Sequence, residues 1–575
     1  LPARYHVFAP ALEGAFACLN DQVPEHAEQH LPRLFLTRHE TCPYCGAPVF
    51  ELAACVRCGK TYIVGRLGKS HEDGPGSASG SEAETVSRLG QLTGHPSSAG
   101  GQLAYFLMSG SVAGLDEDEA VAVQEDLETL DEEKIEPYTL CVKCGAVAPG
   151  NRTHIGCGCG ASSPKLYVQR VDLQGKPQLN HCVSCGSRSP SGIVYRFLTG
   201  QDAPVSVLAT ALYQTLPPSE DEEMEDLPGQ GRKLLAFSDS RQDAAFFAPY
   251  LERTYRRVLR RRLILKTLTE DEAGRAGRLR VQDVVGRLLG QAEDIGLFAQ
   301  RQSYDERQQM MATWLMQELV AWDRRISLEG LGLLRFRLIR PARWRPPALL
   351  LDAPWNLTPE EAWNLIETLI DTLRQHSAVT FPENVDPRDE AFAPRNRQGA
   401  MREDRADSKK GIFSWLPTRG SNRRYDILER LLARTSPSLP DGERQCIVSD
   451  TLRGIWRHLT NPGSVWREHL PSETQRRVGT THRVDYQFYE VVPLVDGAEG
   501  IHQCDRCHAI SYGNVKGICP AYHCEGTLHP VNTSNGDWAQ NHYRYLYRSL
   551  VPVPLQAEEH TAQWTSEEAA KVQDR

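Results

Sequence analysis

Cysteine spacing is the strongest constraint that this sequence places on its fold. Fourteen of the sixteen cysteines stand in close pairs, and five of these pairs read C-x-x-C. Thiolates at this spacing are typical ligands of structural zinc, whereas disulfide frameworks belong to short secreted chains. The 575 residues carry no recognisable signal peptide. We therefore expect a cytoplasmic protein with small lobes held by metal.

The first cluster, CPYCGAPVFELAACVRCGK, predicts one zinc ribbon with the ligands Cys42, Cys45, Cys55 and Cys58. Each C-x-x-C turn is followed by a glycine, which permits a tight turn, and four thiolates complete a tetrahedron. No coordination position stays open, so the expected role is structural. Residues 54–61 loosely match the sequence pattern of a phosphate loop. However, Cys55 and Cys58 within them are expected zinc ligands, and TYIV, which begins at the end of the match, is expected to form a strand rather than a helix. We reject this match as a nucleotide site.

The second cluster leaves two groupings open. One site could combine Cys141 and Cys144 with Cys182 and Cys185, with Cys157 and Cys159 on a hairpin between them. Alternatively, Cys141 and Cys144 pair with Cys157 and Cys159, and Cys182 and Cys185 take other ligands such as His154 or His181. Spacing does not choose, because the cost of loop closure grows only logarithmically with length.

The third cluster, CDRCHAISYGNVKGICPAYHCEG, predicts another ribbon with Cys504, Cys507, Cys519 and Cys524, and with His523 as a substitute ligand. In total we expect two to three structural Zn²⁺ sites. Cys18 and Cys446 stand alone, and we interpret them as buried apolar residues.

The amino-acid composition restricts the kinds of binding partner that we expect for this chain. A mean hydropathy of -0.45 with 24% charged residues is typical of a soluble protein, and no apolar run approaches the roughly 20 residues of a membrane span. The net charge of -9 argues against a wholly basic nucleic-acid coat. Charge is uneven, however: residues 253–280 are strongly basic, and residues 117–136 are acidic. We expect the acidic run to be solvated and to hold a short helix around residues 119–130.

Residues 233–262 predict a strand that leads directly into a helix. The apolar run 234–237 has the length of a buried strand, and Ser238, Asp239 and Ser240 are helix N-cap residues. In open α/β sheets such a loop meets an anion. On the helix that follows, five arginines share one face: Arg253, Arg256, Arg257, Arg260 and Arg261. This stripe suits a phosphate backbone, and it equally suits a solvated face paired with acidic neighbours.

Residues 236–256, AFSDSRQDAAFFAPYLERTYR, resemble the segment that opens the second RecA-like lobe of large bacterial superfamily-two DNA helicases of the DEAD/DEAH type. The relatives are those with extra cysteine modules, known from mitomycin repair and from phage-defence systems such as DISARM and Druantia. LPARYHVFAPALEGAFACL at the start and QAEEHTAQWTSEEAAKVQDR at the end are similar to flanking segments of that family. The resemblance implies that Asp239, Ser240, Arg241 and Gln242 lie at an inter-lobe or nucleic-acid face.

The family's nucleotide-binding motifs are not recognisable in these residues. There is no accepted phosphate loop, and no strand ends in Asp-Glu-x-Asp/His. GRAGR at 274–278 matches the core of the arginine-finger motif, but Asp271 stands where that motif has Gln. We interpret this match as coincidental. The resemblance implies that the first lobe precedes this chain and that the finger motif follows it. ATP and Mg²⁺ are then bound only together with those segments, and no catalytic residue is assigned here.

The expected fold class is α/β plus α: a partial RecA-like helicase lobe with zinc-ribbon modules and a large helical insertion. The helices of that insertion are predicted from apolar spacing, with Thr358 as one N-cap and Pro359 after it. The expected division is a connector with the first ribbon (1–67), a flexible and acidic linker (68–136), a second cysteine module (137–190), the start of the RecA-like lobe (191–270), the helical insertion (271–500), the third ribbon (501–530) and the continuation of the lobe (531–575).

The leading hypothesis is an internal piece of an ATP-dependent DNA helicase or translocase that contacts the DNA backbone without reading sequence. Its partners would be DNA and other subunits of a defence or repair complex. The alternative is a zinc-dependent nucleic-acid-binding or scaffold protein with no motor. A redox protein is disfavoured, because the cysteine pairs suit closed structural sites.

Overall fold

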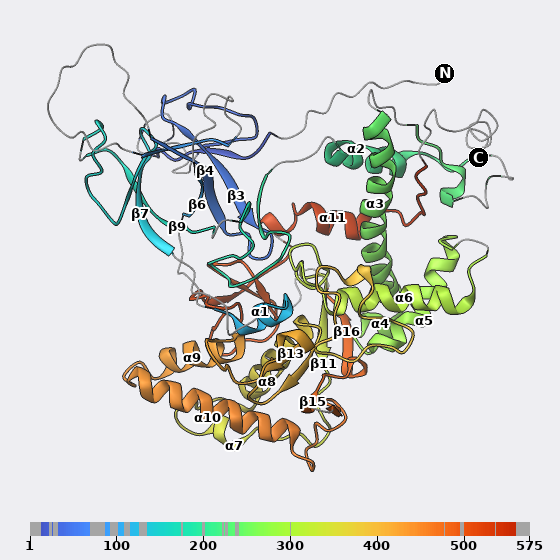
Figure 1. The fold of residues 1–575 in the computed structure, drawn as a ribbon. Helices are drawn as coiled ribbons and strands as arrows, with labels where there is room; N and C mark the ends of the chain where they lie inside the picture. Colours follow the sequence, from blue (N-terminus) through green and yellow to red (C-terminus); the bar gives the residue numbers. More distant parts are fainter. Residues whose placement is uncertain are drawn as a thin grey trace, which may run out of the picture. The chain divides into compact units, whose positions relative to one another are not determined.

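The computed structural model describes residues 13–558 except 22, 24–25, 27–32, 70–86, 93–101, 109–114, 126–134, 161, 174–175, 198–201, 221–223, 225–227, 236–240, 299–300, 476–477, 495–499 and 535. The chain divides into two units (Figure 1). The barrel unit comprises Pro10–Glu119 and Glu128–Gly200. The helical unit comprises Leu1–Ala9, Ala120–Leu127 and Gln201–Arg575. This is a mixed α/β protein, and none of its described helices has the length and apolar character to cross a membrane.

The barrel unit is built from short antiparallel strands. They are β1 Phe16–Cys18, β2 Arg33–Phe35, β3 Val49–Cys55, β4 Thr61–Lys69, β5 Ser87–Gly90, β6 Gln102–Leu107, β7 Ile135–Cys141, β8 Ala146–Pro149, β9 Lys165–Val171 and β10 Val194–Arg196. Six of them close on themselves in the order β4-β5-β8-β7-β9-β6, because β6 pairs back with β4. The closed barrel is filled by apolar side chains such as Ile63, Phe106, Leu140 and Val168.

Four strands continue the sheet beyond the barrel. β3 pairs with β4, β1 and β10, and β2 pairs with β1. In this register Val194 of β10 lies opposite Cys55, and Cys18 of β1 lies opposite Val49. The sequence assigned residues 191–270 to the start of a motor lobe, but β10 belongs to the sheet of the barrel unit. This extension brings cysteines from distant parts of the chain together.

The first part of the acidic run differs from its prediction, and residues 126–134 of the run lie outside the described part of the chain. The short helix is α1 Glu117–Ala122, which begins and ends earlier than predicted. Residues 116–119 are buried rather than solvated, with Glu119 fully inaccessible. The backbone N–H of Arg188 donates to the Glu119 carboxylate at 3.4 Å. A run of charges in a sequence favours a solvated face, whereas here the fold buries Glu119 beside a backbone donor.

The helical unit contains the remaining elements. Its helices are α2 Asp202–Thr215, α3 Arg241–Glu270, α4 Glu272–Arg275, α5 Val281–Asp294, α6 Tyr304–Leu319, α7 Ala348–Leu351, α8 Pro359–Gln375, α9 Arg423–Thr435, α10 Asp441–Thr460 and α11 His542–Ser549. Its strands are β11 Leu334–Leu338, β12 Ala400–Arg402, β13 Ile412–Ser414, β14 Ser472–Gln475, β15 Gly479–His482, β16 Tyr489–Pro493, β17 His502–Cys504, β18 Ile510–Ser511 and β19 Leu528–Pro530.

The region predicted as a mainly helical insertion, residues 271–500, contains helices α4 to α10, and strands β11 to β16 lie in the same region. Helix α8 begins where its sequence indicates: Thr358 is the N-cap, its hydroxyl accepts from the Glu361 backbone, and the Glu361 carboxylate accepts from Thr358 in return. This reciprocal capping satisfies two backbone donors that the helix itself leaves free. The buried face of α8 includes Trp363, Ile366 and Leu369, so this aromatic residue belongs to the core.

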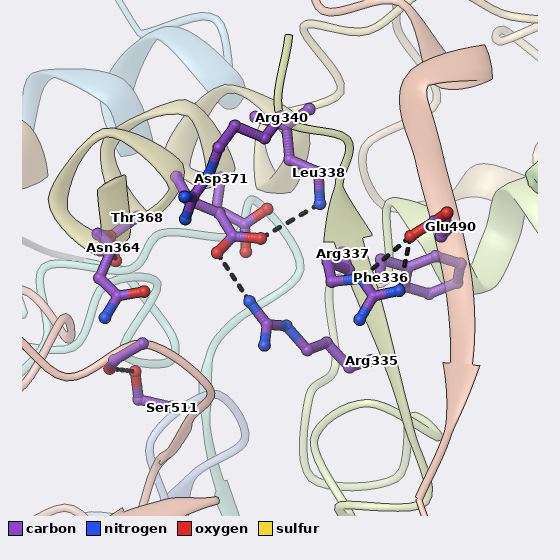
Figure 2. A network of polar contacts seen from close by, with 12 residues as sticks. Arg335, Phe336, Arg337, Leu338, Arg340, Asn364, Thr368, Asp371, Glu490 and Ser511 are labelled. Carbon is purple, nitrogen blue, oxygen red and sulfur yellow. Dashed lines mark hydrogen bonds and ion pairs between the residues drawn. The ribbon is translucent and has the colours of Figure 1, made fainter. Parts of the chain in front are cut away.

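Helix α8 is tied to the β11–β16 pair by the buried carboxylate of Glu367, whose donors Arg335 and Leu338 are labelled in Figure 2. Glu367 accepts from the Arg335 guanidinium at 2.7 Å and from the Leu338 backbone at 3.1 Å. Burial raises the pKa of Glu367 even though Arg335 opposes that shift. On the same strand, Arg337 pairs with Glu490 of β16 at 2.7 Å. These pairs fix the strand register and the helix position, so we assign them a structural role.

Two segments at opposite ends of the helical unit's sequence lie together. The Tyr255 hydroxyl of α3 donates to the Val553 carbonyl at 2.8 Å, and Arg262 donates to the Leu550 carbonyl at 2.8 Å. Arg261 donates to the Tyr547 hydroxyl at 3.1 Å. Helices α3 and α11 therefore lie together, although residues 271–530 separate them in the sequence.

The strand predicted for residues 234–237 is not formed at Leu234 and Leu235, which belong to no strand. The remaining two residues lie outside the described part of the chain. A strand requires a partner strand, and within the described residues 202–270 and 531–558 there is none. The described residues therefore do not show a RecA-like lobe.

Candidate metal centres

All five C-x-x-C pairs adopt the same backbone knuckle. In each, the residue after the second cysteine donates its N–H to the carbonyl of the first cysteine, at 2.8–3.1 Å. That residue has a positive φ in every case: Gly46, Gly59, Gly145, Gly186 and, in the last knuckle, His508. Glycine adopts this conformation without steric cost, which explains the C-x-x-C-G pattern of the first four. Each knuckle directs both sulfurs to one side, as a metal requires.

Among the described residues, four groups of side chains could each hold a metal ion. They are Cys18, His26, Cys42 and Cys45; Cys55, Cys58, Cys182 and Cys185; Cys141, Cys144, Cys157 and Cys159; and Cys504, Cys507, Cys519 and Cys524. Within each group the ligand atoms all lie within 4.8 Å of one another. The cysteines are free thiols rather than disulfides. All fourteen cysteines predicted as ligands belong to these groups.

The sulfur spacing fits a tetrahedral zinc ion. A zinc–sulfur distance of about 2.3 Å places neighbouring ligand sulfurs about 3.8 Å apart. Cys58 and Cys182 lie 3.8 Å apart, and Cys55 and Cys185 lie 4.0 Å apart. In the last group the Cys504–Cys524 and Cys507–Cys519 distances are 3.6 and 3.5 Å. Four convergent sulfurs leave no coordination position for a substrate, which is the arrangement of a structural site.

The single ribbon predicted for Cys42, Cys45, Cys55 and Cys58 is wrong. Most of the residues between the two knuckles belong to one extended strand, β3, whose seven residues span on the order of 20 Å. The knuckle at Cys42 therefore lies at one end of β3 and the knuckle at Cys55 at the other. A zinc ribbon requires a chain reversal between its knuckles, and the spacing alone does not reveal whether one occurs.

The knuckle at Cys55 shares its centre with the knuckle at Cys182. Pairing of β10 with β3 brings them together, and the Val56 backbone donates to the Ile193 carbonyl at 2.9 Å beside them. The Tyr62 hydroxyl lies 3.2 Å from the Cys182 sulfur. Burial raises the pKa of Tyr62 well above its ordinary range, so the hydroxyl stays protonated and can donate to a thiolate. This centre joins segments that are more than a hundred residues apart.

The two remaining groups are local in sequence. Cys141, Cys144, Cys157 and Cys159 form the second of the two groupings that the sequence left open. Cys182 and Cys185 do not take His154 or His181, since neither histidine belongs to their group. The ribbon at Cys504, Cys507, Cys519 and Cys524 has the predicted ligands, without His523.

Helix α9 is hydrogen-bonded to that last ribbon through the guanidinium of Arg430. Arg430 donates to the carbonyls of Cys519, Cys524 and Ala521 at 2.8, 2.6 and 3.1 Å. Its charge is balanced by Asp426 at 2.6 Å. A cation beside four thiolates also offsets their negative charge. The ribbon is thus part of the helical unit's packing.

The two cysteines predicted to stand alone behave differently. Cys446 is exposed, contrary to the prediction of burial. Cys18 is buried but not alone, because its sulfur lies 3.5 Å from that of Cys45. His26 was not predicted as a ligand at all. Neither Cys18 nor His26 belongs to a close pair, so no spacing signal marks them.

The arginine stripe of α3 divides into two parts. Arg253, Arg256 and Arg257 are exposed, with Arg256 paired to Glu252 of the same helix. Arg260 and Arg261 instead bind the buried Glu318 of α6 at 3.1 and 2.7 Å. Burial opposes the ionised carboxylate, but the two arginines outweigh it and lower the pKa of Glu318. Burial also lowers the pKa of Arg260, to about 10, which leaves it charged at neutral pH.

The other predicted nucleic-acid residues are described in part or not at all. Asp239 and Ser240 lie outside the described residues. Arg241 and Gln242 lie in the first turn of α3, and only their backbone is described. The GRAGR sequence, rejected as a finger motif, forms the last two residues of helix α4 and the turn after it. There Arg275 caps the end of α3 by donating to the Thr269 and Glu270 carbonyls.

Comparison with known proteins gives one match. Residues 34–198 match the family described as the YjiV N-terminal domain. This range covers β3 to β10 and most of the barrel unit, including the ligands of the two all-cysteine groups located there. No curated protein and no solved structure matches the chain.

Proposed function

We propose that this chain is part of an ATP-dependent DNA helicase or translocase of superfamily two, to which it contributes the nucleic-acid-facing start of the second motor lobe and structural zinc modules. The carrying observation is the contact between α3 and the segment after α11. Both segments adjoin sequences that resemble parts of one motor lobe. The 271–530 region would then be an insertion whose two ends leave and re-enter that lobe at neighbouring points.

The exposed part of the arginine stripe supports a DNA contact. Arg253, Arg256 and Arg257 project from successive turns of one helix, so their spacing can follow a phosphate backbone. Contacts of this kind position a protein on DNA without reading its sequence. In this proposal the metal centres are structural: they hold small lobes that short strands alone could not stabilise.

The alternative is a zinc-dependent nucleic-acid-binding or scaffold protein without a motor. The absence of a motor-lobe sheet in the described residues 202–270 and 531–558 favours it. Under this alternative the barrel unit and the exposed arginines act inside a larger complex, and no nucleotide is consumed.

The complete reading frame and its product distinguish the two. The motor proposal requires a phosphate loop encoded before Leu1 and a Gln-x-x-Gly-Arg-x-Gly-Arg motif encoded after Arg575. The purified full-length product should then hydrolyse ATP faster when DNA is added. A reading frame without these motifs, or a full-length product that hydrolyses no ATP, overturns the motor and leaves the binding protein.

A further inference from the structure

One group of ligands is assembled from residues that share no sequence pattern. Cys18 is the last residue of β1, and pairing with β3 places it opposite Val49, a few residues after the first knuckle. Its sulfur lies 3.5 Å from that of Cys45. On the other side of the group, the His26 Nε2 atom lies 3.5 Å from the Cys42 sulfur. All four ligand atoms lie within 4.8 Å of one another.

The buried position of the His26 side chain is explained if one of its ring nitrogens binds a metal ion. The side chain is 4% exposed. The other three members of the group are set among the apolar residues Phe16, Ala47 and Val49. Burying a polar imidazole against thiols is unfavourable without a strong acceptor or a metal for its nitrogen. With zinc–nitrogen and zinc–sulfur distances of about 2.0 and 2.3 Å, a tetrahedral ion separates the two ligand atoms by about 3.5 Å. The observed 3.5 Å fits that geometry.

We propose that Cys18, His26, Cys42 and Cys45 form a zinc centre of the Cys₃His type, chemically distinct from the three all-cysteine groups. Three thiolates and a neutral imidazole give a zinc complex with one net negative charge, whereas four thiolates give two. Zinc accepts both nitrogen and sulfur ligands in a closed tetrahedral site. The centre does not depend on the proposed motor function. Cys18 and His26 also precede the residues matched by the YjiV N-terminal domain family.

The centre would fasten the outer strands β1 and β2 to the rest of the barrel unit's sheet. β1 and β2 are short and extend the sheet beyond β3, and β2 is the terminal strand of the described sheet. Strands of three residues have few backbone hydrogen bonds with which to hold their position. A metal shared by Cys18 of β1 and the knuckle before β3 supplies the missing cross-link. His26, in the connection from β1 to β2, adds a second attachment point.

The ligand set can be read directly in the unmodified chain. The full chain would be labelled with ¹⁵N-histidine, loaded with ¹¹³Cd²⁺ and studied by cadmium NMR. We expect four cadmium resonances, of which a single one is split by coupling to a histidine ¹⁵N. The same splitting should persist in His39→Ala, a neighbouring histidine outside the group. A spectrum in which no resonance is split by labelled histidine overturns the proposal.

Zinc content provides a second readout. His26→Ala should bind one zinc fewer per chain than the parent, and His39→Ala should bind as many as the parent. A His26→Ala chain that retains the full zinc content contradicts the assignment. If His26→Ala fails to fold, the cadmium spectrum of the unmodified chain decides alone.

Discussion

Replacing Glu318 by Gln tests whether Arg260 and Arg261, the part of the arginine stripe that binds Glu318, have a structural role. The Glu318 side chain is fully inaccessible and accepts from Arg261, Arg260 and the Leu328 backbone, the last at 3.0 Å. Glutamine keeps the shape but removes the charge, which leaves two guanidinium groups without their counterion. Breaking a buried ion pair from one side costs about 3–5 kcal/mol, and we expect about 3 kcal/mol because the amide oxygen still accepts one hydrogen bond.

The loss should depend on pH. Because the folded-state pKa of Glu318 lies below its ordinary value of 4.5, its ionised form stabilises the folded protein. This contribution is fully present above the unfolded-state pKa and is lost as the pH falls through the lower folded-state pKa. The difference between parent and variant should therefore be constant near neutral pH and shrink in acid.

Tryptophan fluorescence during urea unfolding measures this effect selectively. All ten tryptophans lie between residues 314 and 564, within the helical unit. At roughly 3 kcal/mol per M urea, a loss of about 3 kcal/mol lowers the midpoint by about 1 M. Glu252→Gln is the matched control: its partner Arg256 is exposed, and such a helical pair contributes only about 0.3–0.5 kcal/mol. Equal midpoints for Glu318→Gln and Glu252→Gln would refute the reasoning.

Three further predictions concern the metal centres and DNA. Tyr62→Phe removes a hydroxyl 3.2 Å from the Cys182 sulfur, so the zinc affinity of the centre that contains Cys182 should fall about 10-fold, as measured by competition with a chelator. An unchanged affinity would mean that the hydroxyl does not stabilise the thiolate. Arg430→Met should weaken zinc binding by the last ribbon about 10-fold, whereas Arg434→Met, whose contacts are exposed, should not; equal effects would contradict the role assigned to Arg430. In the full-length product, Arg256→Glu with Arg257→Glu should weaken DNA binding and reduce the salt slope by about 2, and an unaltered affinity would assign these residues to a solvated face.

The sequence predicted local features well. The last ribbon could be identified because all four of its ligands fall within 21 residues, so spacing alone defines the site. Helix α8 could be placed because Thr358, Pro359 and Glu361 specify its start locally. The first four knuckles were recognisable because each needs a glycine at one position.

Features set by strand pairing could not be predicted. Which knuckles share a metal depends on β10 lying against β3, and no local pattern encodes that contact. Cys18 and His26 were missed because a single ligand residue has no spacing partner. Arg260 and Arg261 resembled a continuous basic face until Glu318, from another helix, was seen to bind both. The sequence on one helix does not show what packs against it.

The grouping of the knuckles is tested most directly by zinc content in paired cysteine variants. Cys58→Ser with Cys185→Ser disrupts one centre in the structure, whereas Cys45→Ser with Cys58→Ser disrupts two. The first double variant should therefore bind one zinc fewer than the parent chain, and the second should bind two fewer. A loss of one zinc from Cys45→Ser with Cys58→Ser, and of two from Cys58→Ser with Cys185→Ser, would contradict the account and restore a single ribbon at residues 42–58.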